Sequence, residues 1–185
     1  MQICCWPLEP VLPPLGESVL IRVSVPGCTR SDARGKARDV LRTVLAGWCN
    51  LSLSQILLNE TGKGPACSNK LSGTAFDISL AYGAGEAWIG LACGGRIGVD
   101  VMRVEPFAEA WAVAQAYLGP SVVAAMAQSQ DPERVFAAAW TMREAQLKCA
   151  RLGLVEWTSV EMAAAIETRL DGPDWMGAVA LHPHR

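Results

Sequence analysis

Three residues with chemically useful side chains, Trp140, Glu144 and Lys148, stand four apart in the stretch "AAWTMREAQLKCARLGL". Side chains four apart share one face of an α-helix, so the spacing predicts a carboxylate and an ammonium group side by side. Such a pair could form part of a site for an anionic ligand. Taken alone, however, the spacing favours a packed tryptophan beside an exposed Glu–Lys pair worth about 0.3–0.5 kcal/mol.

A single carboxylate, Asp100, interrupts the apolar stretch "RIGVDVMRV" at 96–104. The alternation of a strand predicts one face for the core, formed by Ile97, Val99 and Val101. Asp100 then shares the opposite face with Gly98 and Met102. Because Asp is depleted in strands, it needs a partner there. Two interpretations stay open: a strand-end Asp bonded to a turn, or a ligand for a hard cation or a base.

Two basic features could contact phosphate. The loop "TGKGP" presents Lys63 between glycines, which let a backbone approach a phosphate closely. Arg34, Arg38 and Arg42 stand four apart on a predicted helix, away from its apolar stripe. Both features are weak alone, since a face of arginines is usually a solvated surface.

Five strands and four helices are predicted to position these residues. The strands cover 18–25, 75–83, 86–95, 96–104 and 174–183. The helices cover 33–50, with Ser31 or Asp32 as N-cap and Gly47 or Asn50 at its end, then 107–118, 121–130 and 131–153, the last closed by Gly153. A polar loop is expected at 59–73, and 154–167 is ambiguous between strand and helix. Strand–helix–strand order occurs on each side of about residue 97, which permits two α+β lobes packed face to face.

Composition narrows the class of protein. A net charge of −2 and a pI near 5.7 argue against broad nucleic-acid binding, and no apolar run approaches the ~20 residues that span a bilayer. The seven cysteines are odd in number and contain no C-x-x-C pair, which favours a reducing cytoplasm over a disulfide framework. The only histidines, His182 and His184, lie at the C-terminus, so a histidine-based centre is not expected. The start of the chain is not expected to be a signal peptide.

The order of the motifs along the chain is more informative than any one of them. "TGKGP" is followed by "FDIS", then by "IGVDV", and about forty residues later by "WTMREAQLK" and "GL". This order resembles the 4′-phosphopantetheinyl transferases of the larger, pseudo-dimeric class that activates peptide and polyketide synthases. In that family the pattern runs G-K-P, F-N-[IL]-S-H-S, [IV]-G-[IV]-D-[IV]-E and W-[ST]-x-K-E-[AS]-x-x-K. The resemblance covers roughly residues 34–154.

The resemblance implies an α+β fold of two similar lobes packed as an intramolecular pseudo-dimer, at 1–97 and 98–185, with the metal site in the second. It also implies a transferase of secondary metabolite biosynthesis, acting in the cytoplasm as a monomer. The reaction moves the 4′-phosphopantetheine arm of coenzyme A to a serine of an acyl or peptidyl carrier protein and releases 3′,5′-ADP. Neither nucleic acid nor membrane is an expected partner.

The same resemblance implies roles for individual residues. Asp100 and Glu144 would hold Mg²⁺ against the pyrophosphate of coenzyme A. Glu144 would also help to deprotonate the attacking serine, and Lys148 would stabilise charge on the transferring phosphate. These three are the expected catalytic residues. Contacts to the phosphates of coenzyme A are expected from Lys148 and from three further residues: Arg34, Lys63 and Ser79.

The chain departs from the family pattern at two of these positions. Met102 replaces the second acid of the metal motif, and a thioether is too soft a ligand for Mg²⁺. Leu80 replaces the histidine that in the family contacts the 3′-phosphate of coenzyme A, and Gly64 is an extra residue in the G-K-P motif. Two alternatives stay open: a degenerate member that binds carrier protein or nucleotide without efficient transfer, and an unrelated structural or interaction protein.

Overall fold

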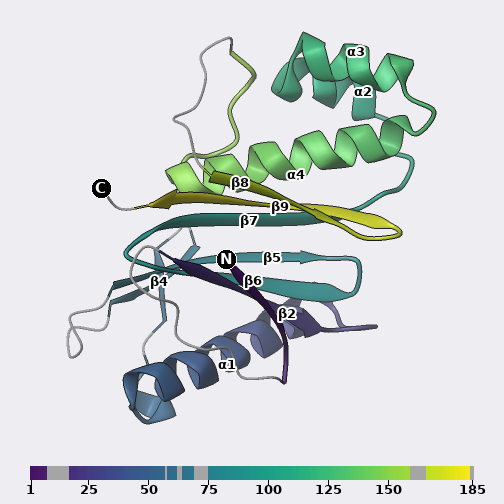
Figure 1. Cartoon of the computed structure of the whole chain (residues 1–185). Helices are drawn as coiled ribbons and strands as arrows, with labels where there is room; N and C mark the ends of the chain where they lie inside the picture. The colour runs from purple at the N-terminus through teal and green to yellow at the C-terminus, as the bar shows by residue number, and fades with distance from the viewer. Residues whose placement is uncertain (8–16, 57, 62–63, 69–74, 159–165, 184–185) are drawn as a thin grey trace.

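The protein has an α+β fold in which two β-sheets pack face to face between helices (Figure 1). The computed structural model describes residues 1–7, 17–56, 58–61, 64–68, 75–158 and 166–183. In Figure 1 the layers run from helix α1 (Arg30–Cys49) at the bottom through the two sheets to helix α4 (Pro132–Ala150) above them. The two outer helices therefore cover opposite faces of a central pair of sheets.

The first sheet has six strands in the order β1-β2-β6-β5-β4-β3. The strands are β1 (Gln2–Cys5), β2 (Ser18–Ser24), β3 (Asn59–Thr61), β4 (Gly64–Ser68), β5 (Ala75–Gly83) and β6 (Glu86–Cys93). The predicted strands at 18–25, 75–83 and 86–95 are confirmed. The expected loop at 59–73 is wrong in part, because β3 and β4 lie within it. Pairing of Cys67 with Phe76 joins β4 to β5, so the next strand along the chain stabilises a strand that local propensity did not indicate.

Helix α1 covers one face of this sheet, as its apolar stripe predicts. Val40, Leu41, Val44 and Leu45 are buried against it. The N-cap is Thr29 rather than Ser31 or Asp32, because the Thr29 hydroxyl accepts a hydrogen bond from the Asp32 N–H at 3.2 Å. Asn50 ends the helix in the left-handed conformation, with φ 51°. A short 3₁₀ turn, Leu53–Gln55, follows it.

The second sheet has three antiparallel strands in the order β7-β9-β8. They are β7 (Gly95–Arg103), β8 (Ile166–Asp171) and β9 (Trp175–Pro183). The predicted strands at 96–104 and 174–183 are thereby confirmed, and β8 includes the end of the segment that was ambiguous. The predicted division into lobes at 97 and 98 falls inside β7 and stays a prediction.

Helix α4 packs on the outer face of the second sheet, and three short helices complete this side of the protein. They are α2 (Ala110–Val113), the π-helical segment η2 (Ala114–Leu118) and α3 (Pro120–Gln128). The predicted helix at 107–118 is therefore present, but it is divided between α2 and η2. Asp131 caps α4 and Pro132 is its first residue, as predicted. The end of α4 is two residues earlier than predicted, because Arg151 rather than Gly153 adopts the left-handed C-cap conformation.

The sheets meet along β5 and β7. The Asp77 carboxylate accepts the Ile97 N–H at 2.7 Å, and the Ser79 hydroxyl accepts the Val99 N–H at 2.9 Å. Ile97 and Val99 are fully buried between the sheets, beside Gly90 of β6, which leaves no room for a β-carbon. The predicted core face of β7 is thus confirmed, and its other face points to α4.

Candidate functional site

Lys148 of α4 and Asp100 of β7 form an ion pair at the centre of the candidate site. The Lys148 Nζ donates to Oδ1 of Asp100 at 2.7 Å and to the carbonyl of Val99 at 2.9 Å. The two side chains are 32% and 15% exposed, so both remain reachable from solvent at one edge. Burial raises the pKa of Asp100, while the charge and hydrogen bond of Lys148 oppose that rise. Asp100 is thus a shielded carboxylate held by a cation, and not a strand-end Asp bonded to a turn.

Glu144 lies one helical turn before Lys148 and faces the same charge cluster. Burial raises the pKa of Glu144, and the negative charge of Asp100 raises it further. The positive charges of Lys148 and Arg143 act in the opposite direction. Within the described part of the chain, no hydrogen bond or ion pair of Glu144 is found. Its carboxylate is therefore available to a ligand, and its raised pKa suits a group that accepts a proton.

The two carboxylates have the chemistry of a Mg²⁺ site. Mg²⁺ is usually bound by one or two carboxylates, with waters and substrate phosphates completing the octahedron. A divalent cation beside Asp100 and Glu144 would offset both the burial of the two groups and their mutual repulsion. The described residues contain no group of three or more His, Cys, Asp or Glu side chains arranged for a metal. A Mg²⁺ ion held by Asp100 and Glu144 would therefore need further oxygen ligands from a bound substrate or from water.

A glycine of β7 brings α4 close enough for these contacts. A β-carbon on Gly98 would stand 1.8 Å from the carbonyl oxygen of Ala145 and 2.6 Å from the backbone nitrogen of Cys149. The helix backbone therefore rests directly on the strand at this point. Glu144 directly precedes Ala145, and Lys148 follows it by three residues on the same helix. The close approach of the helix to the strand therefore sets the distance of both side chains from Asp100.

Trp140 and Met102 both pack against an apolar cluster that includes Phe136 and Met126. The Trp140 ring stacks on Phe136 at 5.9 Å between centroids and meets Tyr117 edge-on at 6.1 Å. The packed-tryptophan interpretation of the Trp140 spacing is therefore confirmed. The idea of an isolated surface Glu–Lys pair is wrong, because Lys148 bonds across to β7.

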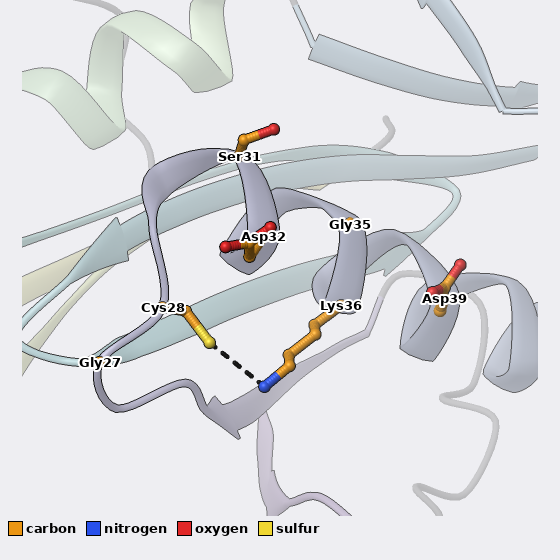
Figure 2. A pocket seen from close by; sticks show the side chains of 7 residues that line it. All are labelled: Gly27, Cys28, Ser31, Asp32, Gly35, Lys36 and Asp39. Carbon is orange, nitrogen blue, oxygen red and sulfur yellow. Dashed lines mark hydrogen bonds between the residues drawn. The ribbon is translucent and has the colours of Figure 1, made fainter.

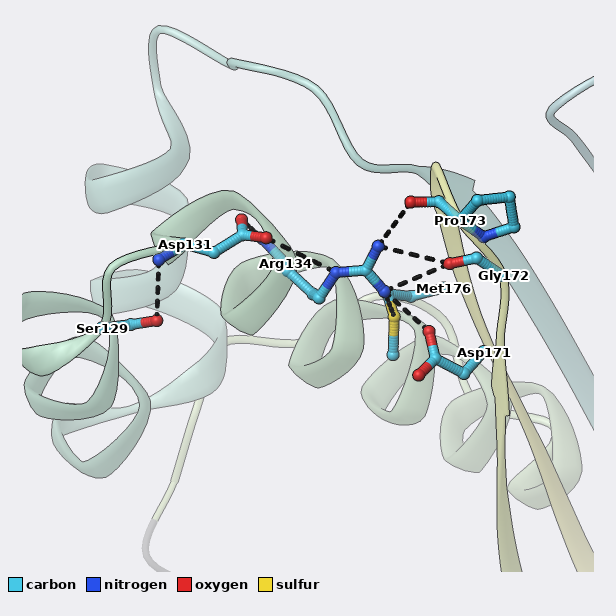
Figure 3. A network of polar contacts seen from close by, with 7 residues as sticks. All are labelled: Ser129, Asp131, Arg134, Asp171, Gly172, Pro173 and Met176. Carbon is cyan, nitrogen blue, oxygen red and sulfur yellow. Dashed lines mark hydrogen bonds and ion pairs between the residues drawn. The ribbon is translucent and has the colours of Figure 1, made fainter.

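Arg134 fixes the other end of α4 to the turn between β8 and β9 (Figure 3). Its guanidinium donates to Oδ1 of Asp171 at 2.6 Å and to the carbonyl oxygens of Pro173 at 2.6 Å and Gly172 at 3.2 Å. It also lies 3.4 Å from Asp131, the N-cap of the same helix. These contacts orient α4 along the sheet and so orient the residues that it carries.

The stretch of chain that builds this site is similar to a known family. Residues 96–175 match the family model of the 4′-phosphopantetheinyl transferase superfamily. The matched stretch, a little under half of the chain, begins in β7 and includes all of α4, so Asp100, Glu144 and Lys148 lie within it. No curated protein matches the chain. The similarity supports phosphopantetheinyl transfer in general, with coenzyme A and a carrier protein as the substrates of such an enzyme.

Of the residues expected to bind coenzyme A, Lys148 belongs to this ion pair, whereas the described contacts of Ser79 and Arg34 lie elsewhere. Ser79 is 4% exposed, and its hydroxyl is engaged by Val99 of β7. Lys63 lies outside the described residues. A phosphate contact from either one stays a prediction, and the transfer chemistry proposed below does not depend on it.

Arg34 belongs to a basic row over Tyr82 at the end of β5. Its guanidinium carbon lies 6.0 Å from the centre of the Tyr82 ring. Burial raises the pKa of Tyr82, whereas the charges of Arg38, Arg34 and Arg30 lower it. Arg34, Arg38 and Arg42 all lie on α1, as predicted, and Arg42 pairs with Asp39 at 3.3 Å. Leu80 lies on the same face of β5, packed against the α1 core.

A shallow pocket at the start of α1 contains none of the predicted site residues (Figure 2). Its lining includes Cys28 and Lys36, whose Nζ donates to the Cys28 sulfur at 3.2 Å. The carboxylates of Asp32 and Asp39 also line it, so it offers mixed charge and no concentrated cation for a phosphate. We assign no function to this pocket.

Two residues next to the site, Asp77 and Arg151, were not predicted as functional. Arg151 follows α4 and donates to Oδ1 of Asp77. One signal in the sequence could have pointed to Asp77, because it occupies the position of the asparagine in the F-N-[IL]-S-H-S pattern. The pairing itself joins segments 74 residues apart and follows only from the fold.

Proposed function

We propose that this protein transfers the 4′-phosphopantetheine arm of coenzyme A to a serine of an acyl or peptidyl carrier protein. One observation carries the proposal: an available carboxylate, Glu144, faces the Asp100–Lys148 pair within the stretch that matches the transferase family model. We further propose that the chain belongs to the pseudo-dimeric class. The two-sheet α+β fold supports this, since each sheet is covered by its own long helix.

The transfer requires a base, and Glu144 is the proposed one. The serine Oγ of the carrier protein forms a bond to the phosphorus that carries the pantetheine arm. The bond from that phosphorus to the bridging oxygen of the pyrophosphate breaks, and 3′,5′-ADP leaves. The serine proton passes to Glu144, whose carboxylate faces the Asp100–Lys148 pair.

Lys148 supplies a fixed positive charge for the transferring phosphate. Its position is set before substrate binds, because Asp100 and the Val99 carbonyl both accept hydrogen bonds from it. A preorganised cation stabilises charge without the cost of reorienting solvent during the reaction. Its third N–H remains for a phosphate oxygen.

Mg²⁺ is part of the proposal, with Asp100 and Glu144 as its protein ligands. When bound, the ion would neutralise the charge of the pyrophosphate and help the leaving group to depart. Arg34, with Arg30 and Arg38 beside it, is proposed to contact the outer phosphates of coenzyme A, since three arginines one turn apart concentrate positive charge over Tyr82.

Mass spectrometry of apo-carrier proteins tests the proposed function. Incubation with coenzyme A, Mg²⁺ and this chain should add one phosphopantetheine group to the carrier serine. A serine-to-alanine carrier is the matched control, and it should stay unmodified. A panel of acyl and peptidyl carriers that all remain in the apo form would contradict the proposal.

A second candidate is a family member that binds carrier protein or nucleotide without efficient transfer. Met102 favours it, because this residue packs into the Trp140 cluster where the family places a second acid. Measuring ligand binding and transfer activity separately distinguishes the two candidate functions. Thermal stabilisation by coenzyme A with Mg²⁺, together with unmodified carrier in the mass spectrum, would support the second.

A further inference from the structure

The residue that ends α4, Arg151, holds an unusual backbone conformation. It adopts φ 61° and ψ 31°, a left-handed region in which a glycine is favoured over a residue with a β-carbon. Its side chain turns back toward the first sheet, where Nη2 donates to Oδ1 of Asp77. The Arg151 and Asp77 side chains are only 25% and 16% exposed, so the pair is largely shielded from solvent.

Asp77 joins three elements through one carboxylate. The residue itself lies in β5, its Oδ1 accepts from Arg151 after α4, and its Oδ2 accepts the Ile97 N–H of β7 at 2.7 Å. Burial lowers the pKa of the Arg151 guanidinium. The ion pair therefore ties the last turn of α4 both to its own sheet and to the other one.

Arg151 is also bonded directly to Lys148. The Arg151 N–H donates to the Lys148 carbonyl at 3.1 Å, so a shift of Arg151 is passed to the Lys148 backbone. The Lys148 ammonium in turn reaches Asp100 and the Val99 carbonyl. Asp77 and Lys148 thus hold β7 from opposite sides, two residues apart along the strand.

We infer that Asp77 and Arg151 form a positioning pair, which holds the last turn of α4 so that Lys148 lies against Asp100. The catalytic part of this inference rests on the proposed function, because it assigns Lys148 to the transfer reaction. The geometric part is independent of any activity. A helix end that needed only a cap would be served by glycine, which adopts the same backbone conformation at no steric cost.

Two substitutions separate positioning from folding. Arg151→Gly removes the ion pair but suits the left-handed backbone, and Asp77→Asn keeps an oxygen for the Ile97 N–H while removing the charge. Asn50→Gly is the matched control, because Asn50 is the left-handed C-cap of α1, with φ 51°. Thermal unfolding should show that all three variants fold.

The first readout is the ¹³Cε resonance of Lys148 in the full chain, which has four lysines. Lys148→Arg assigns the resonance by its disappearance. In Arg151→Gly and in Asp77→Asn, we expect the Lys148 resonance to move toward the resonances of the other lysines. The shift in the double variant should be no larger than in either single variant, because the two residues act as one unit. An unmoved resonance in both single variants, or an equal shift in Asn50→Gly, would overturn the inference.

The second readout is the rate of transfer to a carrier protein. Arg151→Gly and Asp77→Asn should lower kcat roughly tenfold, since small misplacements near reacting groups are costly, and leave KM for coenzyme A within about twofold. Unchanged kcat in both variants would overturn the catalytic part. If the unmodified chain transfers nothing, the proposed function fails by itself, and the Lys148 resonance alone decides whether the pair positions this residue.

Discussion

Gly98 of β7 lies in direct contact with the backbone of α4 at Ala145, where a β-carbon would stand 1.8 Å from the carbonyl oxygen. The atom that it would meet belongs to a helix backbone and cannot rotate away. Because Glu144 adjoins Ala145 and Lys148 lies one turn further on, this single contact decides how far both side chains stand from Asp100.

Gly98→Ala should therefore destabilise the protein and displace the site. We expect a loss of roughly 1–3 kcal/mol in the free energy of unfolding, the usual cost of overpacking. Chemical denaturation measures it. Gly47→Ala on α1 is the matched control, because nothing lies within 4 Å of its β-carbon. That change should stabilise by about 0.5–1 kcal/mol, the ordinary gain for glycine to alanine in a helix. Equal effects of the two changes would contradict the close contact.

Glu144→Gln should fold normally and lose most transfer activity. The amide keeps the shape of the side chain but cannot accept the serine proton, and loss of a positioned base lowers rates about 10²–10⁴-fold. Carrier modification at saturating coenzyme A, followed by mass spectrometry, measures the loss. Glu133→Gln, in the first turn of the same helix, is the control and should retain the parent rate. Near-normal turnover by folded Glu144→Gln would exclude Glu144 as the base.

The stability of the protein relative to Glu144→Gln should fall as the pH rises. The pKa of Glu144 is raised in the folded state, so the fold favours the protonated form. The contribution of Glu144 to the free energy of unfolding is fully present below its pKa in the unfolded chain, about 4.3. This contribution is lost as the pH rises through the higher pKa of Glu144 in the folded protein. Urea denaturation from about pH 4 to 8 without Mg²⁺, for both proteins, measures the difference. A difference that grows with pH in favour of the parent would show that Glu144 is stabilised as a carboxylate.

Asp100→Asn should weaken Mg²⁺ binding more than it weakens the fold. The amide still offers an oxygen to Lys148, whereas a neutral oxygen is a poorer ligand for a hard cation. Calorimetric titration with Mg²⁺ in the presence of coenzyme A compares the variant with the parent. Glu133→Gln, in the first turn of α4, is the control and should bind as the parent does. If Asp100→Asn binds Mg²⁺ as the parent does, Asp100 is not a metal ligand and serves only as the partner of Lys148.

Met102→Glu should strengthen Mg²⁺ binding, because it adds a carboxylate on the face of β7 that carries Asp100. The substitution also removes the packing of Met102 against the apolar cluster that includes Phe136. We therefore expect Mg²⁺ affinity to rise and the free energy of unfolding to fall. Met102→Gln is the control, with the same length and no charge. The double change Leu80→His, Met102→Glu extends the test to coenzyme A. If neither the Mg²⁺ requirement nor KM for coenzyme A moves, these positions do not face the ligand.

Local periodicity was sufficient to predict which residues of the site face one another. The alternation in β7 separates Ile97 and Val99 from Asp100, and the four-residue spacing in α4 puts Glu144 and Lys148 on one edge. Both follow from backbone geometry within a single element, which requires no knowledge of the remaining fold. The positions of most strands and helices follow for the same reason.

Contacts between distant segments were decided only by the tertiary structure. Strands β3 and β4 form where a loop was predicted, because pairing with β5 stabilises a stretch of low strand propensity. Lys148 could have been an exposed partner of Glu144, and only the close approach of Gly98 to α4 brings it to Asp100. Arg151 replaces the predicted Gly153 as the helix end, and its side chain pairs with Asp77 of β5. The last two outcomes depend on partners far away in the sequence, and no local pattern encodes which partners those are.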